Sequence, residues 1–344
     1  MAGAILLSSC AANETAGSGN ASGTLNGAGS SAQGSAQEAW RAAFQTANSK
    51  ATINYDPSGS GAGREQFIAG GVDFAGSDSA LKPEEIAGGF AGCVDGSGYV
   101  QVPVYISPIA VIFNVKGVDA LNLDATTLAG IFKGTITKWD DPAIVALNPD
   151  ATLPSASITA VHRSDDSGTT KNFTDYLNKV APAVWDAPAA DPFPYKVGEG
   201  ANGTSGVVDA VTNGTNTIGY ADASKAGSLT IAAIKVGDKF VAPSAEGAAK
   251  VVAESPAGAT ASDADLSVAL DRTTTDPSHY PLVLVSYIDA CLEYKDAKVG
   301  SLVKEYVSYI ASEKGQADAA AAAGSSPLTS ELSAKVLAVV GNIK

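Results

Sequence analysis

Residues 163–169, Arg-Ser-Asp-Asp-Ser-Gly-Thr, bring together side chains that suit an anion. The planar fork of Arg163 can bind two oxygens of a tetrahedral anion, and the hydroxyls of Ser167 and Thr169 add donors. The segment follows a predicted strand over 158–163 and precedes a predicted helix. A helix start offers unpaired N–H groups and a partial positive charge, so the pattern predicts an anion site.

Two other loops have the same construction, with small residues between a strand end and a helix start. They are residues 27–32 (Gly-Ala-Gly-Ser-Ser-Ala) and residues 57–63 (Pro-Ser-Gly-Ser-Gly-Ala-Gly). One such loop is common in α/β proteins, but three in one chain favour a shared site. Ser31 precedes a predicted helix over 36–47, where its hydroxyl is expected to cap the first turn.

Two acidic residues, Asp78 and Asp165, stand beside these donors. A carboxylate suits an anion site only if the ligand brings a proton, which phosphate does near neutral pH and sulfate does not. A site that accepts a ligand proton can reject an analogue without one by roughly 10⁴–10⁵-fold. Arg163 would keep Asp165 ionised as the acceptor. The alternative is that Arg163 and Asp165 only pair with each other, and that Asp78 is a turn residue.

Size and charge narrow the class of protein. A chain of 344 residues favours two domains. The sequence contains no run of 18 or more apolar residues, the length that would predict a membrane span. The formal net charge of −14 argues against a nucleic-acid partner, which requires many Lys and Arg. The same charge would not steer an anion from a distance, so an anion site must work through short-range hydrogen bonds and local dipoles.

Strands and helices alternate along the chain, which predicts an α/β fold with a mostly parallel sheet. Residues 100–115 form a long apolar, β-branched run and predict a buried strand. Pro103 and Pro108 suggest that this strand bends as it crosses between two domains. A further strand is predicted over 280–288.

The three cysteines fall into two groups, Cys10 near the N-terminus and the pair Cys93 and Cys291. Cys10 ends a lipobox-like Leu-Ser-Ser-Cys and precedes a polar tether over 11–24, so we expect lipidation there and a truncated signal before it. An ordinary buried thiol is the alternative. An exported protein would be oxidised, so Cys93 and Cys291 can form a disulfide.

Rival functions receive less support. Ser167 near His162 suggests a Ser-dependent phosphate-ester hydrolase, but His162 and Arg163 are strand neighbours and should face opposite ways. The His and Cys spacing predicts no metal site. A receptor for sulfate, molybdate or another oxyanion, or one that signals to a partner, remains open because it would use the same site.

Five stretches resemble the motifs of the phosphate-binding protein of bacterial phosphate-specific ABC transporters, in the same order. They are residues 27–31 of the first glycine-rich loop, Val72–Asp78, Lys138–Asp141, Arg163–Thr169 and Ile218–Tyr220. The resemblance implies a periplasmic-binding-protein fold of the second type, which would follow a truncated signal remnant and tether over 1–24. One domain would comprise 25–108 plus about 255–344, and the other 109–254.

The same resemblance implies a binding protein and not an enzyme, with inorganic phosphate held between the domains and no cofactor. The expected ligand residues are Ser31, Ala32 (through its N–H, where the family often has Phe), Ser60, Asp78, Arg163, Asp165, Ser167, Gly168 (through its N–H) and Thr169. Ser58 competes with Ser60 for one position. The implied partners are the membrane permease subunits of an importer, and the protein is expected to be a monomer outside the cytoplasm, anchored to the cell membrane.

Overall fold

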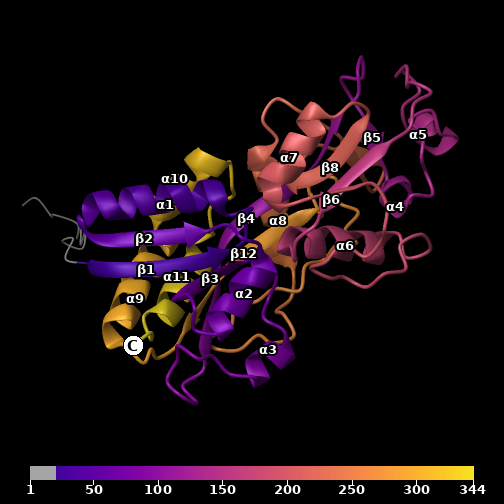
Figure 1. The fold of residues 1–344 in the computed structure, drawn as a ribbon. Coiled ribbons are helices and arrows are strands. Elements are labelled where there is room, and N and C mark those ends of the chain that lie inside the picture. Colours follow the sequence, from indigo (N-terminus) through magenta and orange to yellow (C-terminus); the bar gives the residue numbers. More distant parts are fainter. Residues whose placement is uncertain (1–20) are drawn as a thin grey trace, which may run out of the picture.

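Strand β4 (Tyr99–Asn114) connects the two α/β lobes that the computed structural model describes over residues 21–344 (Figure 1). Its first part pairs with β12 (Val283–Cys291), as far as Pro108. From Ile109 onward it pairs with β8 (Thr217–Asp222) instead. This change of partner confirms the prediction of a long buried strand that crosses between domains.

The first lobe is built on the sheet order β2-β1-β3-β12-β4. Strand β1 is parallel to β2 and to β3, whereas β12 runs antiparallel to β3 and β4. The remaining elements of this lobe are β1 (Ser22–Gly29), β2 (Lys50–Asp56), β3 (Phe74–Ser77), α1 (Gly34–Ala47), α2 (Ser60–Ile68), α3 (Pro83–Ala87), α9 (Ala297–Ala311), α10 (Glu313–Ala323) and α11 (Ser330–Val340).

The second lobe continues the sheet from β4 through β8 and β6 to β7, with β6 parallel to both of its neighbours. A small separate sheet has the order β11-β10-β5. The elements of this lobe are β5 (Asn122–Leu123), β6 (Thr159–Arg163), β7 (Glu199–Ala201), β9 (Thr230–Ile231), β10 (Ala233–Val236), β11 (Lys239–Val241), α4 (Ala125–Lys133), α5 (Pro142–Leu147), α6 (Gly168–Val180), α7 (Gly203–Asn213) and the 3₁₀ helix η1 (Ala223–Lys225). Helix α8 (Ala245–Glu254) packs on the crossing strands β4 and β12.

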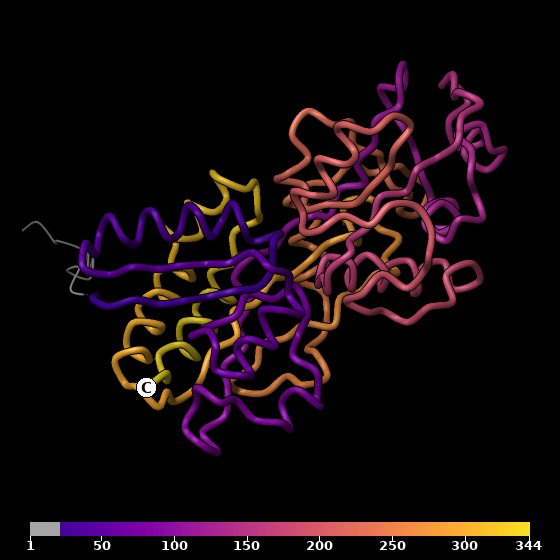
Figure 2. The backbone as a smooth tube through the Cα atoms, in the orientation of Figure 1, coloured from indigo at the N-terminus to yellow at the C-terminus, as the bar shows by residue number. Residues whose placement is uncertain are grey.

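The chain passes from the first lobe to the second and back, so the indigo and yellow ends of the chain share one lobe in Figure 2. On the way back, Leu266 donates its N–H to Gln101 of β4. The following segment still contacts the second lobe, because Arg272 pairs with Asp175 of α6. The limits of the two domains given above stay a prediction.

Three local predictions were wrong. Strand β1 begins at Ser22, inside the expected tether, because residues 22–24 pair with β2. Strand β12 begins at Val283 and not at residue 280. Ser31 does not cap α1, whose N-cap is Gln33 without a side-chain cap, and the hydroxyl of Ser30 accepts the N–H of Ala32 instead.

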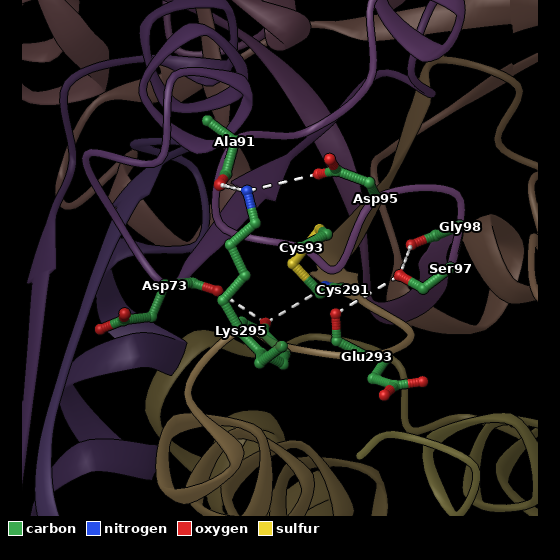
Figure 3. Close-up of a disulfide and its surroundings, with 10 residues drawn as sticks. Asp73, Ala91, Cys93, Asp95, Ser97, Gly98, Cys291, Glu293 and Lys295 are labelled. Atoms are coloured by element: carbon green, nitrogen blue, oxygen red, sulfur yellow. Dashed lines mark hydrogen bonds and ion pairs between the residues drawn. A yellow bond between two sulfur atoms is a disulfide. The ribbon is translucent and has the colours of Figure 1, made fainter.

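A disulfide joins Cys93 to Cys291 across a sequence separation of 198 residues, with the Cα atoms 5.2 Å apart (Figure 3). Both cysteines are buried. The bond ties the loop after α3 to the end of β12, where the N–H of Val94 also donates to the carbonyl of Glu293. Cys10 lies outside the described residues. Among residues 21–344, no helix has the length and apolar character needed to cross a membrane.

Candidate ligand-binding site between the lobes

The three glycine- and hydroxyl-rich loops meet at the junction of the lobes. Within the first lobe, the N–H of Gly59 donates to the carbonyl of Gly29 at 2.8 Å. Across the junction, the N–H of Gly61 donates to the carbonyl of Asp166 at 3.0 Å. The start of α2 therefore lies against the loop that precedes α6, at the junction of the lobes.

Glycine is required where the opposing loops touch. Gly59 has φ +104°, and a Cβ on it would lie 2.6 Å from Oδ2 of Asp165. A Cβ on Gly168 would lie 2.6 Å from Oγ of Ser60 and 2.8 Å from Cβ of Asp78. Larger residues at these two positions would keep the lobes apart.

Asp78 follows β3 and is buried, with 4% of its surface exposed. Its Oδ1 accepts a hydrogen bond from Ser286 at 2.5 Å, and its Oδ2 accepts one from Thr169 of the second lobe at 3.1 Å. Burial raises the pKa of Asp78, although hydrogen bonds from Ser286, Ser30 and Thr169 oppose the shift. The carboxyl is thus a buried acceptor that contacts both lobes.

Asp165 has a different environment. Arg163, at the end of β6, forms a two-pronged ion pair with it, through Nε to Oδ1 at 2.7 Å and through Nη2 to Oδ2. The N–H of Gly203 at the start of α7 also donates to Oδ1, at 3.0 Å. Burial acts to raise the pKa of Asp165, but Arg163 outweighs it and the pKa is lowered. The structure therefore has the pairing of Arg163 with Asp165 that the sequence left as the alternative.

The first-lobe residues of the predicted set lie at the same junction. Ser31 bonds Thr204 of α7, with 2.8 Å between the hydroxyl oxygens. Ser60 is buried, and its hydroxyl accepts the N–H of Asp78 at 3.1 Å. Ser58 points elsewhere, toward the carbonyl of Asp56 at 3.5 Å. This geometry favours Ser60 over Ser58 as the site residue.

The hydrolase interpretation gains nothing from the geometry. The Ser167 hydroxyl caps α6 by accepting the N–H of Thr170 at 3.2 Å. Both ring nitrogens of His162 lie 2.9 Å from backbone carbonyls, those of Arg163 and Val197, and its ring stacks on Phe193. Over the described part of the chain, no group of three or more His, Cys, Asp or Glu side chains is arranged to hold a metal ion.

The sequence analysis missed a buried ion pair between the lobes. Arg64 of α2 reaches Asp191 of the second lobe, with Nη2 and Oδ2 2.8 Å apart, and Ser79 donates to Oδ1 of Asp191 at 2.9 Å. The carbonyl of Asp191 accepts the N–H of Ser167. Burial acts to raise the pKa of Asp191, but the charge of Arg64 outweighs it and the pKa is lowered. No local motif connects positions 127 residues apart.

Two other contributors were also missed. Thr204 stands in Asn202-Gly203-Thr204-Ser205, a fourth run of small polar residues at a helix start, so the same signal could have found it. Ser286 lies inside a buried strand, where a lone hydroxyl gives no signal. A cavity of about 300 Å³ adjoins Asp78 between the lobes and is lined in part by Lys82, Lys171 and Lys179.

Two α/β lobes that share crossing strands and enclose a polar site define a bilobal solute-binding protein. A family model for the PBP superfamily domain matches residues 14–314. Phosphate-binding protein PstS 3 of Mycobacterium tuberculosis is 40% identical over 272 residues, covering 77% of this chain and 72% of that protein. Phosphate-binding protein PstS2 of Mycobacterium bovis is 35% identical over 357 residues, covering 99% and 96%. The chain belongs to the PBP superfamily and, within it, to the family of PstS phosphate-binding proteins.

Solved structures agree on the fold. A phosphate-binding protein from Stenotrophomonas maltophilia superimposes with a TM-score of 0.72 at 23% identity, covering 92% of this chain and 94% of that one. A high-affinity periplasmic phosphate-binding protein, solved with bound phosphate, gives 0.73 at 23% identity and covers 92% and 93%. These likenesses confirm the two-domain periplasmic-binding-protein fold that was predicted.

Proposed function

We propose that this protein captures inorganic phosphate outside the cytoplasmic membrane and delivers it to an ABC importer. The observation that carries the proposal is a buried carboxyl, Asp78, set among hydrogen-bond donors at the junction of the lobes. A proton-bearing anion satisfies both the donors and this acceptor, and a fully deprotonated anion leaves the acceptor opposed to a like charge.

The two acidic residues have different roles in this proposal. Asp78 accepts the ligand proton. Asp165 holds the guanidinium of Arg163 in the orientation that presents its remaining N–H groups to the ligand. The other ligand groups are the hydroxyls of Ser31, Ser60, Ser167 and Thr169 and the N–H groups of Ala32 and Gly168. Lys82 and Lys171 give the adjoining cavity a local positive charge within an acidic protein.

Binding is coupled to closure of the lobes. Each lobe supplies part of the donor set, so only the closed form can surround a tetrahedral ion. The direct contacts Ser31–Thr204, Asp78–Thr169 and Arg64–Asp191 stabilise that form. The closed form is the one that the permease subunits of the importer would recognise.

Titration calorimetry with phosphate tests the binding step. We expect one phosphate per chain and no competition from sulfate in excess. Equal competition by sulfate would instead make the protein a general oxyanion receptor. Steady hydrolysis of a phosphate ester by the parent protein, lost in Ser167→Ala, would make it an enzyme.

The anchoring and assembly proposals follow from the family and from the N-terminal motif. Cys10 would carry the lipid, and the protein would act as a monomer at the membrane surface. Detergent phase partitioning of the parent and of Cys10→Ala tests the anchor, because only the parent should enter the detergent phase. Light scattering tests the monomeric state, because a monomer should have the mass of a single chain.

A further inference from the structure

A continuous chain of buried hydrogen bonds leads from helix α9 to the carboxyl of Asp78. Tyr306 donates to Oε1 of Gln37 at 2.9 Å, and Nε2 of Gln37 is 2.9 Å from Oε1 of Gln33. Nε2 of Gln33 is 2.6 Å from Oγ of Ser286, which is 2.5 Å from Oδ1 of Asp78. All five side chains are at most 4% exposed.

The donors and acceptors of this chain fix one direction. An amide nitrogen can only donate, so Nε2 of Gln33 must donate to Ser286. A second bond from Nε2 to the carbonyl of Tyr287, at 3.0 Å, holds the amide in that orientation. Ser286 therefore accepts a hydrogen bond from Gln33 and donates its own hydrogen to Oδ1 of Asp78.

We propose that Ser286 and Gln33 are specificity-determining positioning residues, which fix Asp78 as a hydrogen-bond acceptor and so make the site select an anion that brings its own proton. The inference rests on the proposed phosphate-binding function. It adds residues that belong to none of the loops that would contact the ligand.

The position of the chain in the fold supports this role. Gln33 and Gln37 belong to α1 and its N-cap, Tyr306 to α9 and Ser286 to β12, all in the first lobe. Thr169, by contrast, reaches Asp78 from the second lobe. This series of hydrogen bonds can therefore orient Asp78 whether the lobes are open or closed. Thr169 adds its hydrogen bond only when the lobes close.

Removing the Ser286 hydroxyl has two consequences for selectivity. Asp78 loses its donor at Oδ1 and, as a buried carboxyl, is protonated more readily. A protonated Asp78 can donate to sulfate, so sulfate binding gains while phosphate binding weakens. General damage to the site would lower both affinities together, which makes their ratio the informative quantity.

The test measures phosphate binding by calorimetry, alone and in competition with sulfate, for the parent protein and four variants. We expect the phosphate-to-sulfate affinity ratio to fall roughly 10-fold to 100-fold in Ser286→Ala, the loss typical of one hydrogen bond to a charged group. Ser286→Thr keeps a hydroxyl and should keep the parent ratio. Gln33→Met should shift the ratio in the same direction as Ser286→Ala, by less. Thr217→Val is the matched control, since it also removes one buried hydroxyl, one that donates to the carbonyl of Val211.

A parent that discriminates between the anions, together with Ser286→Ala and Gln33→Met variants that keep its ratio, overturns this inference and leaves the proposed function standing. A parent that does not bind phosphate overturns both. If Ser286→Ala does not fold, Gln33→Met decides: an unchanged ratio in that variant refutes the inference, and a lowered ratio supports it.

Discussion

Asp78 and Asp165 lie at the same junction, yet their surroundings shift their pKa values in opposite directions. Asp78 lies among neutral donors, Ser286 from its own lobe and Thr169 from the other, and burial raises its pKa. In the second lobe Arg163 neutralises Asp165, and despite the opposing effect of burial the pKa is lowered. Asp78 accepts hydrogen bonds from neutral groups, whereas Asp165 forms a direct ion pair with Arg163.

The difference assigns the two roles. Three hydrogen bonds, two from Arg163 and one from Gly203, already occupy the oxygens of Asp165. Asp78 accepts its hydrogen bonds from neutral hydroxyl groups, among them those of Ser286 and, from the opposite lobe, Thr169. In the proposed site a ligand proton would therefore find its acceptor at Asp78, and Asp165 would serve to orient Arg163. A carboxyl held by neutral donors can respond to the protons of a ligand, whereas one locked in an ion pair cannot.

The largest effect is expected for Asp78→Asn, which replaces an acceptor oxygen by a donor amide. The phosphate-to-sulfate affinity ratio should fall at least about 100-fold, because the amide can donate to sulfate. Competition calorimetry measures the ratio. Asp73→Asn is the control, since the carboxylate of Asp73 accepts the N–H of Asn26 away from the junction. An Asp78→Asn protein with the parent ratio would reduce Asp78 to a turn residue.

The next effect is expected for Arg163→Lys, which keeps the charge but loses the planar fork. Phosphate affinity should fall roughly 10-fold to 100-fold, since Lys cannot bind Asp165 and two ligand oxygens in one plane. The affinity ratio should change much less than in Asp78→Asn. A ratio that collapses here as well would show that the two acidic residues share one role.

A smaller effect is expected for Asp191→Asn, which removes the ion pair between the lobes and changes no predicted ligand residue. Phosphate affinity should fall about 10-fold, because the closed form loses a stabilising contact. X-ray scattering of the phosphate-free protein should show a larger radius of gyration. Asp186→Asn, at an exposed ion pair with Lys133, is the matched control and should leave both quantities unchanged.

The smallest effect on binding is expected for Asp289→Asn. This variant tests what the burial of a carboxyl without hydrogen-bond partners does to stability. Both carboxyl oxygens of Asp289 are buried without a hydrogen-bond partner within residues 21–344, and burial raises the pKa well above its ordinary value of 3.8. A raised pKa in the folded state means that the stability linked to the protonated form is lost as the pH rises. The variant should therefore gain free energy of unfolding relative to the parent as the pH rises from 5 to 8. Denaturant titrations at the two pH values measure the gain, and a gain that does not grow with pH would contradict it.

Sequence patterns predicted the α/β alternation and the long crossing strand because both depend on short-range signals, whereas the two-domain binding-protein fold was implied by the family resemblance; the predicted ligand residues stay a prediction. The apolar run of β4 and the hydroxyl-glycine loops are readable within about ten residues of chain. The contact of Ser286 with Asp78 and the ion pair between the lobes cannot be read in this way, because Ser286 lies 208 residues from Asp78 and Asp191 lies 127 residues from Arg64. The capping role given to Ser31 failed for a related reason, since its hydroxyl pairs with Thr204 in the other lobe.

A crystal structure of the protein with bound phosphate tests the central claim most directly. The account predicts one phosphate between the lobes, with an oxygen about 2.5–2.7 Å from the carboxyl of Asp78, the spacing of a hydrogen bond from a ligand hydroxyl to a carboxylate. It also predicts that Asp165 contacts Arg163 and not the ion. A phosphate bound elsewhere, or one whose protonated oxygen faces Asp165 while Asp78 points away, would contradict it.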